Sequence, residues 1–518
     1  MAKYSSEFTI NSLSEQVSLT NPGRELLRKL EIEFSVRNTK EFSYQERAHY
    51  RAVKNWLGKY QSQINASNLE QVRGYLEAFH HLCEIEAWEQ ASKLLVVPLN
   101  TPANKELHDQ LRIWSYYQEQ IQLYKRLPLN QLHPHIHLIC LRGLGLAHRA
   151  LGNYSQAIAY HQQHLTLAKE IGDRTHEGMA LGNLGNVFCA MGDYSEGIKH
   201  HQQHLTLARE IGDRHGEGLA LGHLGIVCYS QGNYQQAIDY YQQDLAIARE
   251  VGDRHGEGAT LCNLGNVYQE IGDYDQALEH YQQDLTIVRE MGDRAGEGMT
   301  LNNLGCVHAS LQNYELSIEY HQQALKIAQD VGHIPGQANA LGNLGNAYYA
   351  LGNYGQASDY HQQHLNISQR IGDRDGEKLA ITHLGNVYFN LKDFHQSLDY
   401  YRQSLKIAQD IGDRSGEATA LCNLGAALME LQQDLQALEP LQQAREIYRV
   451  SGARPNEILA LYNLAELYQK LGNTRLAHEY CDLGLTLAQE IGIFVKEGQG
   501  LKVSFGEVEQ ASGRESNA

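Results

Sequence analysis

The chain has 518 residues, of which 42% are hydrophobic and 20% are charged, a composition typical of folded proteins rather than disordered ones. Its formal net charge of −18 at pH 7 argues against binding to nucleic acid, because that binding depends on Lys and Arg meeting phosphates. No run of 18 apolar residues occurs, and the first residues lack the basic and then apolar layout of a secretion signal, so we expect a cytoplasmic protein without a membrane segment.

Residues 1–140 differ in pattern from the rest of the chain. They hold all three tryptophans, and residues 68–95 have the apolar spacing of one divergent helix pair. We expect residues 1–140 to cap a longer helical array, since the end units of repeat arrays need a modified outer face. A separate contact with a partner is the alternative. The stretch LPLNQLHPHIH, residues 127–137, contains two prolines and is the candidate hinge or loop.

From residue 141 to residue 500 the chain repeats with a period of 40. The repeated pairs are Leu144-Gly145, Leu184-Gly185, Leu224-Gly225, Leu264-Gly265, Leu304-Gly305, Leu344-Gly345, Leu384-Gly385 and Leu424-Gly425, with Leu464-Ala465 as a degraded ninth unit. A fixed period of this size predicts a solenoid of about nine units, each burying its apolar face against its neighbours. Glycine inside a helix costs roughly 0.5 to 1 kcal/mol relative to alanine, so its return indicates close helix packing. Residues 501–518 are polar and are expected to be frayed.

Glycine and acidic residues mark two helix boundaries in each unit. Gly192 can end one helix in a left-handed conformation, Asp193 can cap the next, and Glu196 can complete a capping box. Gly212 and Asp213 repeat this arrangement at the second boundary. Each unit is therefore expected to consist of two antiparallel helices of about four to five turns.

The spacing of Leu181, Leu184, Gly185 and Phe188, followed in the second helix by a small and then an aromatic residue, resembles that of tetratricopeptide repeats. The LGN and GDY motifs and the 40-residue length are similar to cell-polarity adaptors of the LGN/Pins type and to bacterial, especially cyanobacterial, tetratricopeptide proteins. The resemblance implies an all-α fold, an α-solenoid in which stacked antiparallel helix pairs form a right-handed superhelix. The G-protein binding of the LGN/Pins adaptors is not carried over, because the sequence shows no counterpart of their C-terminal motifs.

The same resemblance places partner contacts on the first helix of each pair. Asparagine recurs directly after the glycine, and its amide can both donate hydrogen bonds to, and accept them from, the backbone of a bound segment. Aromatic side chains one turn further along are typical of interface hot spots. The candidate partner-binding residues are Asn186, Asn266, Asn302, Asn346, Tyr349, Asn386, Phe389 and Asn390. Two alternatives stay open: the asparagines bridge adjacent helices, and the aromatic side chains pack against the next unit.

Histidine and cysteine give no pattern of a metal or disulfide site. His161 and His164 are spaced to share a metal, but the equivalent residues of another unit are Tyr241 and Asp244, so we expect a packing role. Clustered histidines are nevertheless expected to make stability depend on pH near neutrality. The eight cysteines form no CxxC pair, and we expect reduced, buried thiols. We expect no metal and no cofactor.

The sequence contains no phosphate-binding loop, zinc-protease motif or serine-hydrolase motif. It predicts a non-enzymatic adaptor whose groove holds an extended or helical segment of a partner protein or peptide, not a nucleic acid or a membrane. The second hypothesis is a structural protein that self-associates. In its favour, residues 1–60 carry ten basic against seven acidic residues, whereas residues 241–280 carry two against eight.

Overall fold

The computed structural model describes residues 23–30, 32, 42–63, 66–99 and 105–491. Within these residues there are 25 α-helices and no strand, and the only extended pairing is an isolated bridge between Pro98 and Glu106. The predicted all-α fold is confirmed. None of the described helices is both long and apolar enough to cross a membrane. The chain divides into two compact units, Met1–Val251 and Gly252–Ala518.

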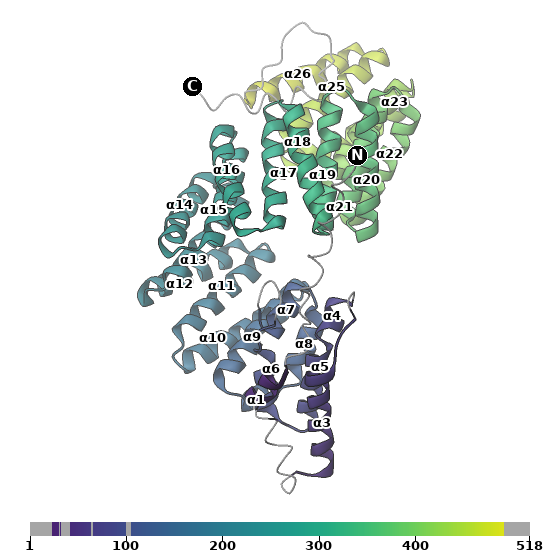
Figure 1. Ribbon diagram of the computed structural model, residues 1–518. Helices are drawn as coiled ribbons and strands as arrows, with labels where there is room; N and C mark the ends of the chain where they lie inside the picture. Colours follow the sequence, from purple (N-terminus) through teal and green to yellow (C-terminus); the bar gives the residue numbers. More distant parts are fainter. Residues whose placement is uncertain (1–22, 31, 33–41, 64–65, 100–104, 492–518) are drawn as a thin grey trace, which may run out of the picture. The chain divides into compact units, whose positions relative to one another are not determined.

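The first unit begins with shorter helices and continues with regular pairs (Figure 1). Its helices are α1 (Gly23–Lys29), α3 (Tyr44–Lys59), α4 (Asn68–Gln71), α5 (Arg73–Glu84), α6 (Trp88–Leu95), α7 (Leu107–Ile113), α8 (Tyr117–Lys125), the 3-10 turn η1 (Leu129–Gln131), α9 (Pro134–Ala150), α10 (Tyr154–Glu170), α11 (Arg174–Ala190), α12 (Tyr194–Ile211), α13 (Arg214–Ser230) and α14 (Tyr234–Val251). One apolar core includes Leu26, Phe79 and Tyr124 together with Leu144 of α9. The N-terminal helices therefore pack on the first helix of the array, and a capping role stays a prediction.

Two segments that the sequence singled out lie in this unit. Residues 68–95 form the pair α5 and α6, preceded by the single turn α4. The candidate loop at 127–137 contains η1 and the start of α9, which begins at Pro134. The predicted tail, residues 501–518, lies outside the described residues.

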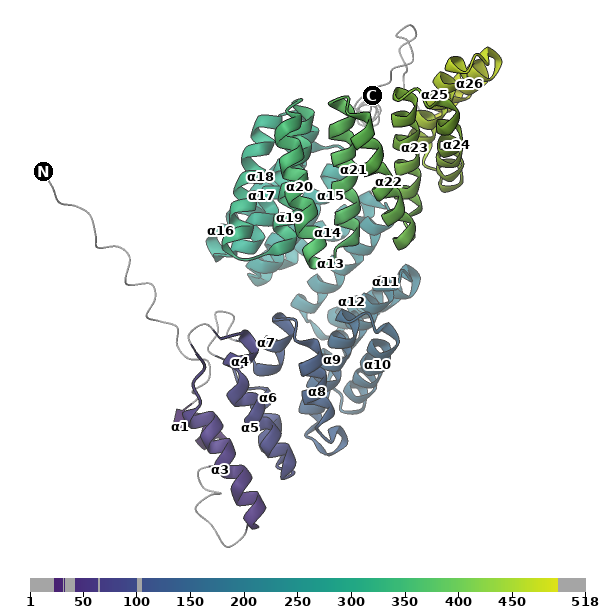
Figure 2. The ribbon, with the colours of Figure 1, turned by 90° about the vertical axis from the view of Figure 1, so that its right-hand side faces the viewer.

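The second unit consists, in its described part, of six consecutive helix pairs that lie side by side in chain order (Figures 1 and 2). They are α15 (Arg254–Glu270) and α16 (Tyr274–Met291), α17 (Arg294–Ser310) and α18 (Tyr314–Asp330), α19 (Ile334–Ala350) and α20 (Tyr354–Ile371), α21 (Arg374–Asn390) and α22 (Phe394–Ile411), α23 (Arg414–Glu430) and α24 (Asp434–Ser451), and α25 (Arg454–Lys470) and α26 (Thr474–Glu490). Helices of 17 or 18 residues agree with the predicted length.

The helix boundaries follow the predicted glycine and aspartate signals. Gly212 ends α12 with a φ of 70°, in the left-handed region. Asp213 Oδ1 then accepts a hydrogen bond of 2.9 Å from the backbone N–H three residues later. Asp193 caps α12 in the same way, at 3.2 Å from the N–H of Glu196. The Glu196 carboxylate does not return to the cap as the capping-box prediction expected; it contacts Lys199 Nζ at 3.0 Å.

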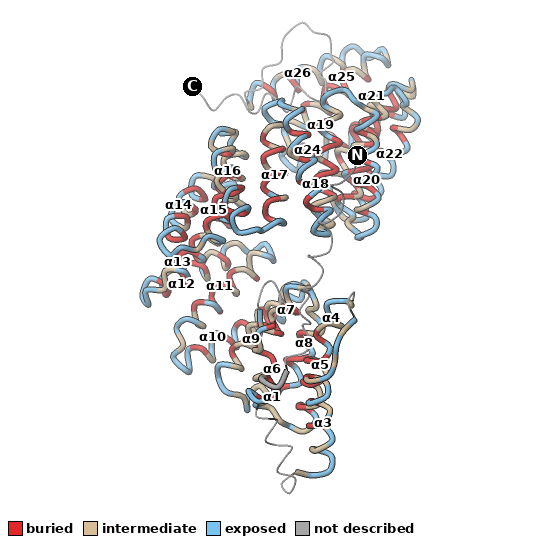
Figure 3. Tube along the Cα trace, viewed as in Figure 1, coloured by how far each residue is buried: buried red, intermediate tan, exposed pale blue. Residues whose placement is uncertain are grey.

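In seven of the eight Leu-Gly pairs the glycine lies against a ring from the second helix of its own pair, and Gly425 lies against Leu441 instead. A Cβ on Gly265 would stand 2.6 Å from Tyr281 Cε1, and one on Gly185 would stand 2.6 Å from His201 Cε1. Both rings are buried, and buried residues run along the facing sides of the paired helices (Figure 3). The predicted close packing is confirmed, because no side chain fits between glycine and ring.

Candidate functional site

Asparagine side chains connect consecutive first helices of the second unit. Asn343 Nδ2 of α19 donates to Asn302 Oδ1 of α17 at 3.1 Å, and Asn303 Nδ2 of α17 donates to Cys262 Sγ of α15 at 3.6 Å. The same contact recurs between α25 and α23 at 3.3 Å. These donors stand directly before the repeated leucine, a position that the sequence analysis missed. The signal was present as asparagine returning at that phase of the repeat.

Three of the predicted asparagines use their side-chain oxygen inside the array. Asn266 Oδ1 accepts a hydrogen bond from the Tyr281 hydroxyl at 2.6 Å, and Asn386 Oδ1 accepts one from the Tyr401 hydroxyl at 2.8 Å. Asn302 Oδ1 lies 2.9 Å from a histidine ring nitrogen of α18. These three oxygens therefore bridge adjacent helices, which is the alternative given above. Partner binding through the same residues stays a prediction.

Two of the remaining three predicted asparagines make fewer contacts. Asn346 of α19 is exposed, and Asn186 of α11, in the first unit, is half-buried. Among the described residues neither amide has a hydrogen-bond partner. Asn346 is therefore available to a ligand without breaking an internal contact.

Tyr349, Tyr354 and Asn390 form a polar aromatic cluster across α19, α20 and α21, which we name the tyrosine cluster. Asn390 Nδ2 donates to the Tyr349 hydroxyl at 2.6 Å and to the Asn386 carbonyl at 3.0 Å. The two tyrosine rings meet edge to face at 5.5 Å. Burial raises the pKa of Tyr349, so its hydroxyl stays protonated at neutral pH. Of the predicted residues, the structure thus brings Tyr349, Asn386 and Asn390 together.

Phe389 points into a different environment. Its ring meets Phe394 edge to face at 5.3 Å and packs against the apolar core of α22 to α25. The side chain is half-buried. Phe389 therefore fits the alternative in which the aromatic side chain packs inside the array better than it fits an exposed interface hot spot.

A cavity of 480 Å³ lies among helices α15 to α19, and we name it the α15–α19 cavity. Asn266 and Asn302 line it together with Asp284 of α16. Only 3% of Asp284 is exposed, and its Oδ2 accepts a hydrogen bond of 2.6 Å from Thr300 Oγ1. Burial raises the pKa of Asp284, the Thr300 bond lowers it, and the charge of Asp293 raises it again. The cavity therefore holds a carboxylate whose charge is poorly compensated.

Seven histidines on the second helices are buried: His161, His164, His201, His204, His321, His361 and His364. Burial lowers the pKa of His161 and of His164 to about 3, and His164 Nε2 lies 3.0 Å from His176 Nδ1. In the described part of the chain, His135, Asp173 and His176 form the one group that could hold a metal, with ligand atoms within 4.8 Å of one another. Sequence reasoning missed this group because its members come from two helices and a cap. We assign no metal to it, since the charge of nearby Arg142, which acts on His176, repels a cation.

The cysteines are all free, as predicted. Four are buried and four are half-buried. Burial raises the pKa of Cys422 and of Cys262 to about 12, so these thiols are protonated and unreactive at neutral pH.

Comparisons with known proteins agree with this geometry. Tetratricopeptide-repeat family models match residues 141–175, 176–250, 221–290, 296–370, 377–449 and 416–490, which together make up more than half of the chain. The chain belongs to the tetratricopeptide-repeat family. No curated protein sequence matches this tetratricopeptide-repeat protein.

Several solved structures are similar to this tetratricopeptide-repeat protein. A signal transduction ATPase with numerous domains and a tetratricopeptide repeat sensor, from Pyrococcus horikoshii, is 15% identical with a TM-score of 0.52, over 92% of this chain and 68% of that one. The apo form of RapI is 17% identical with a TM-score of 0.45, over 53% and 99% of the two chains. A Rap protein complexed with competence and sporulation factor is 15% identical with a TM-score of 0.45, over 81% and 98%. At 15% identity the likeness to the Pyrococcus horikoshii protein shows the fold alone.

Proposed function

We propose that this tetratricopeptide-repeat protein is a non-enzymatic, cytoplasmic adaptor that holds a segment of a partner protein on the first helices of its second unit. The observation that carries the proposal is the tyrosine cluster, where Tyr349 and Asn390 link α19 to α21 beside the exposed Asn346. Amides and phenol hydroxyls can bond the backbone of an extended segment without requiring one sequence. Tyrosine also offers apolar area at a low cost in side-chain entropy.

Exposed apolar side chains on the same helices support this surface. Met299 on α17 is 54% exposed and Leu379 on α21 is 49% exposed, and both stand five residues before the repeated leucine. Leu379 lies seven residues before Asn386, so the two side chains share one face of α21. Single exposed leucines are common, but at this phase of the repeat α19 has Asn339 and α23 has Thr419, so apolar and polar side chains alternate from α17 to α23 beside the amides. The surface is therefore suited to a segment with both apolar and polar groups.

Peptides selected from a random display library on the full-length protein provide the first test. Asn390→Ala and Tyr349→Ala are each expected to weaken binding of a selected peptide by about 1 to 2 kcal/mol, because they break the link between α19 and α21. Asn346→Ala, Asn386→Ala and Phe389→Ala test the remaining predicted residues. Fluorescence anisotropy gives the dissociation constants.

Asn313→Ala is the matched control for these variants. Asn313 is exposed and precedes α18, and its side chain makes no cap hydrogen bond. This variant is expected to bind as the wild type does. Unchanged affinity in all of the Tyr349, Asn346, Asn386, Phe389 and Asn390 variants, with melting curves that show a folded protein, would reject the assigned surface.

Self-association stays a prediction from the sequence. Several residues of the basic front end lie outside the described residues. In the array, Arg254 already pairs with Glu257 at 2.6 Å and with Glu290, which leaves less unpaired acidic charge than the sequence suggests. If charge attraction joins copies, their sedimentation coefficient must fall as salt rises.

A further inference from the structure

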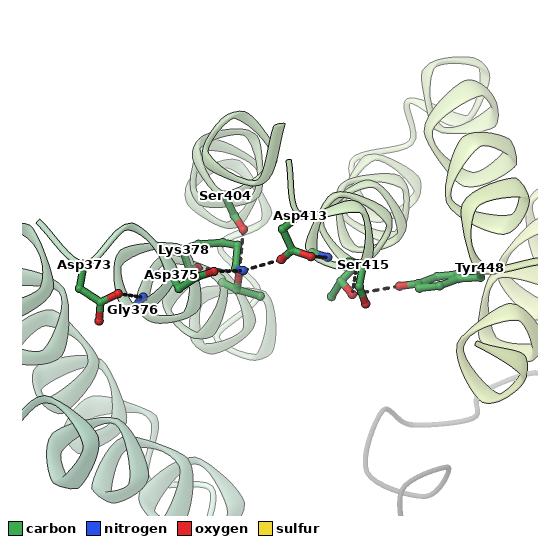
Figure 4. A network of polar contacts seen from close by, with 11 residues as sticks. Asp373, Asp375, Gly376, Lys378, Ser404, Asp413, Ser415 and Tyr448 are labelled. Atoms are coloured by element: carbon green, nitrogen blue, oxygen red, sulfur yellow. Dashed lines mark hydrogen bonds and ion pairs between the residues drawn. The ribbon is translucent and has the colours of Figure 1, made fainter. Parts of the chain in front are cut away.

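The array holds one buried ammonium group of its own. Lys378, in the first turns of α21, is 8% exposed. Its Nζ donates to Asp375 Oδ1 at 2.9 Å and pairs with Asp413 Oδ2 (Figure 4). The alkyl chain runs past Gly416, where a Cβ would stand 3.1 Å from Lys378 Cδ. Because Asp413 caps α23, the ammonium lies at the junction of two consecutive helix pairs.

The α15–α19 cavity occupies the equivalent place three units earlier. At 120 positions before Lys378, Asp413 and Gly416 stand Gly258, Asp293 and Gly296. All three of these residues line the cavity. Where the later unit places a lysine side chain, the earlier unit has a glycine, so the space stays open. The carboxylate of Asp293, which caps α17, remains in place.

The cavity also has a carboxylate that the Lys378 site lacks. Asp284 stands where the later unit has Ser404, whose hydroxyl is hydrogen-bonded to Thr382 at 2.7 Å. Asp284 Oδ1 would lie 2.9 Å from a Cβ on Gly258, so it stands beside the space that glycine leaves. A buried carboxylate is costly unless a cation pairs with it.

The rest of the cavity wall is largely apolar, although His255, His333, several asparagines and Arg254 also line it. The charge of Arg254 is paired with Glu257 and Glu290. The apolar side chains that line it include Ile287, Val288, Met291, Met299, Ile327 and Val331. A hydrated metal ion would have to lose water against such a wall, whereas an alkylammonium group presents methylenes to the wall and its charge to the carboxylates. The shape and charge of the cavity therefore favour a lysine-like group.

We propose that the α15–α19 cavity receives the side chain of a lysine from the partner segment, with its ammonium between Asp284 and Asp293 and its methylenes against the apolar wall. That this lysine belongs to a partner rests on the proposed function. That the cavity accepts an alkylammonium group does not, because within the chain Lys378 places such a group against Asp413, the counterpart of Asp293.

Butylammonium is the first probe, with n-butanol as its neutral analogue, and binding to the full-length protein is measured by saturation-transfer NMR. Butylammonium is expected to bind saturably and butanol is not. Asp284→Asn is expected to weaken butylammonium binding by about 30-fold or more, since a charge-paired partner is removed. Equal binding of the two probes, or no binding of butylammonium, would overturn the inference. Neither result touches the tyrosine cluster, which the peptide variants test separately.

Two further variants use the repeat as its own control. Gly258→Lys combined with His255→Asp and Asp284→Ser reproduces Lys378, Asp375 and Ser404 of the later unit, and is expected to abolish butylammonium binding in a folded protein. Lys378→Gly opens a second cavity, and butylammonium is expected to restore part of the melting temperature that this variant loses. Continued binding in the first variant, or no recovery in the second, would contradict the equivalence of the two sites.

The source of the ammonium is tested with the selected peptides. Replacing their lysine by norleucine keeps the length of the side chain and removes its charge, and this change is expected to weaken binding to the wild type by tenfold or more but not binding to Asp284→Asn. Cadaverine, a free diamine, is the competitor. If cadaverine binds more tightly than the lysine peptide, the cavity is a site for small amines and the partner lysine is rejected.

Discussion

Acidification from pH 7 to pH 4 is expected to unfold the repeat array. Burial lowers the pKa of seven histidines to about 4 or below: His161, His164 and His201 to about 3, His223, His321 and His383 to about 4, and His361 to about 2. In the unfolded chain these side chains bind protons near pH 6.5. The unfolded state therefore binds more protons than the folded state below that pH, and stability falls as pH decreases. Urea midpoints measured by circular dichroism between pH 7 and pH 4 check this.

The repeat supplies a substitution that tests the cause. His361 stacks on His383 with ring centroids 4.8 Å apart, whereas the equivalent residues of the next unit are Tyr401 and Asn423. His361→Tyr combined with His383→Asn removes two groups with lowered pKa and keeps a residue pair that the array already uses. This double variant is expected to unfold at a lower pH than the wild type. An unchanged acid midpoint would show that acid unfolding has another origin.

Gly265→Ala is expected to destabilise the protein by about 1 to 3 kcal/mol, the usual effect of overpacking. Helix propensity alone predicts the opposite, a gain of about 0.5 to 1 kcal/mol. The new Cβ would stand 2.6 Å from Tyr281 Cε1, and the fully buried Tyr281 ring cannot move aside without disturbing its own contacts. Urea denaturation measures the free energy of unfolding.

Gly355→Ala is the matched control for this prediction. Gly355 lies in α20, and no atom would stand within 4 Å of its Cβ. Propensity then acts alone, and the substitution is expected to stabilise the protein by up to about 1 kcal/mol. If both alanine variants were stabilising, the packing of Gly265 against the Tyr281 ring would not be tight.

Much of the fold could be predicted from the sequence because its signals are local. Gly212 and Asp213 specify a helix end and a cap through their own backbone and side-chain chemistry. The return of glycine at one position of each repeat likewise predicted the close packing of the two helices in a pair. The division between Val251 and Gly252 has no such signal, because residues 251–254 read VGDR where residues 211–214 read IGDR.

The site was harder to predict because the same side chain serves several purposes. Asn346 and Asn386 stand at one phase of the repeat, yet Asn346 is exposed and Asn386 is bonded to Tyr401. Only the ring opposite each asparagine decides this, and that ring varies between units. The α15–α19 cavity corresponds to Gly258 in one unit and Lys378 in another, but that difference in sequence does not show whether neighbouring side chains fill the space.

The fit between glycine and ring has a consequence for how such a chain grows. Gly265 and Tyr281 belong to the same pair, as do Gly185 and His201, so the tightest interlock is completed inside each stretch of 40 residues. A gene segment that encodes one whole period carries both halves of that interlock and can be copied or lost as a module. An insertion between the glycine and its ring would separate the halves, whereas tandem duplication in whole periods keeps every copy foldable.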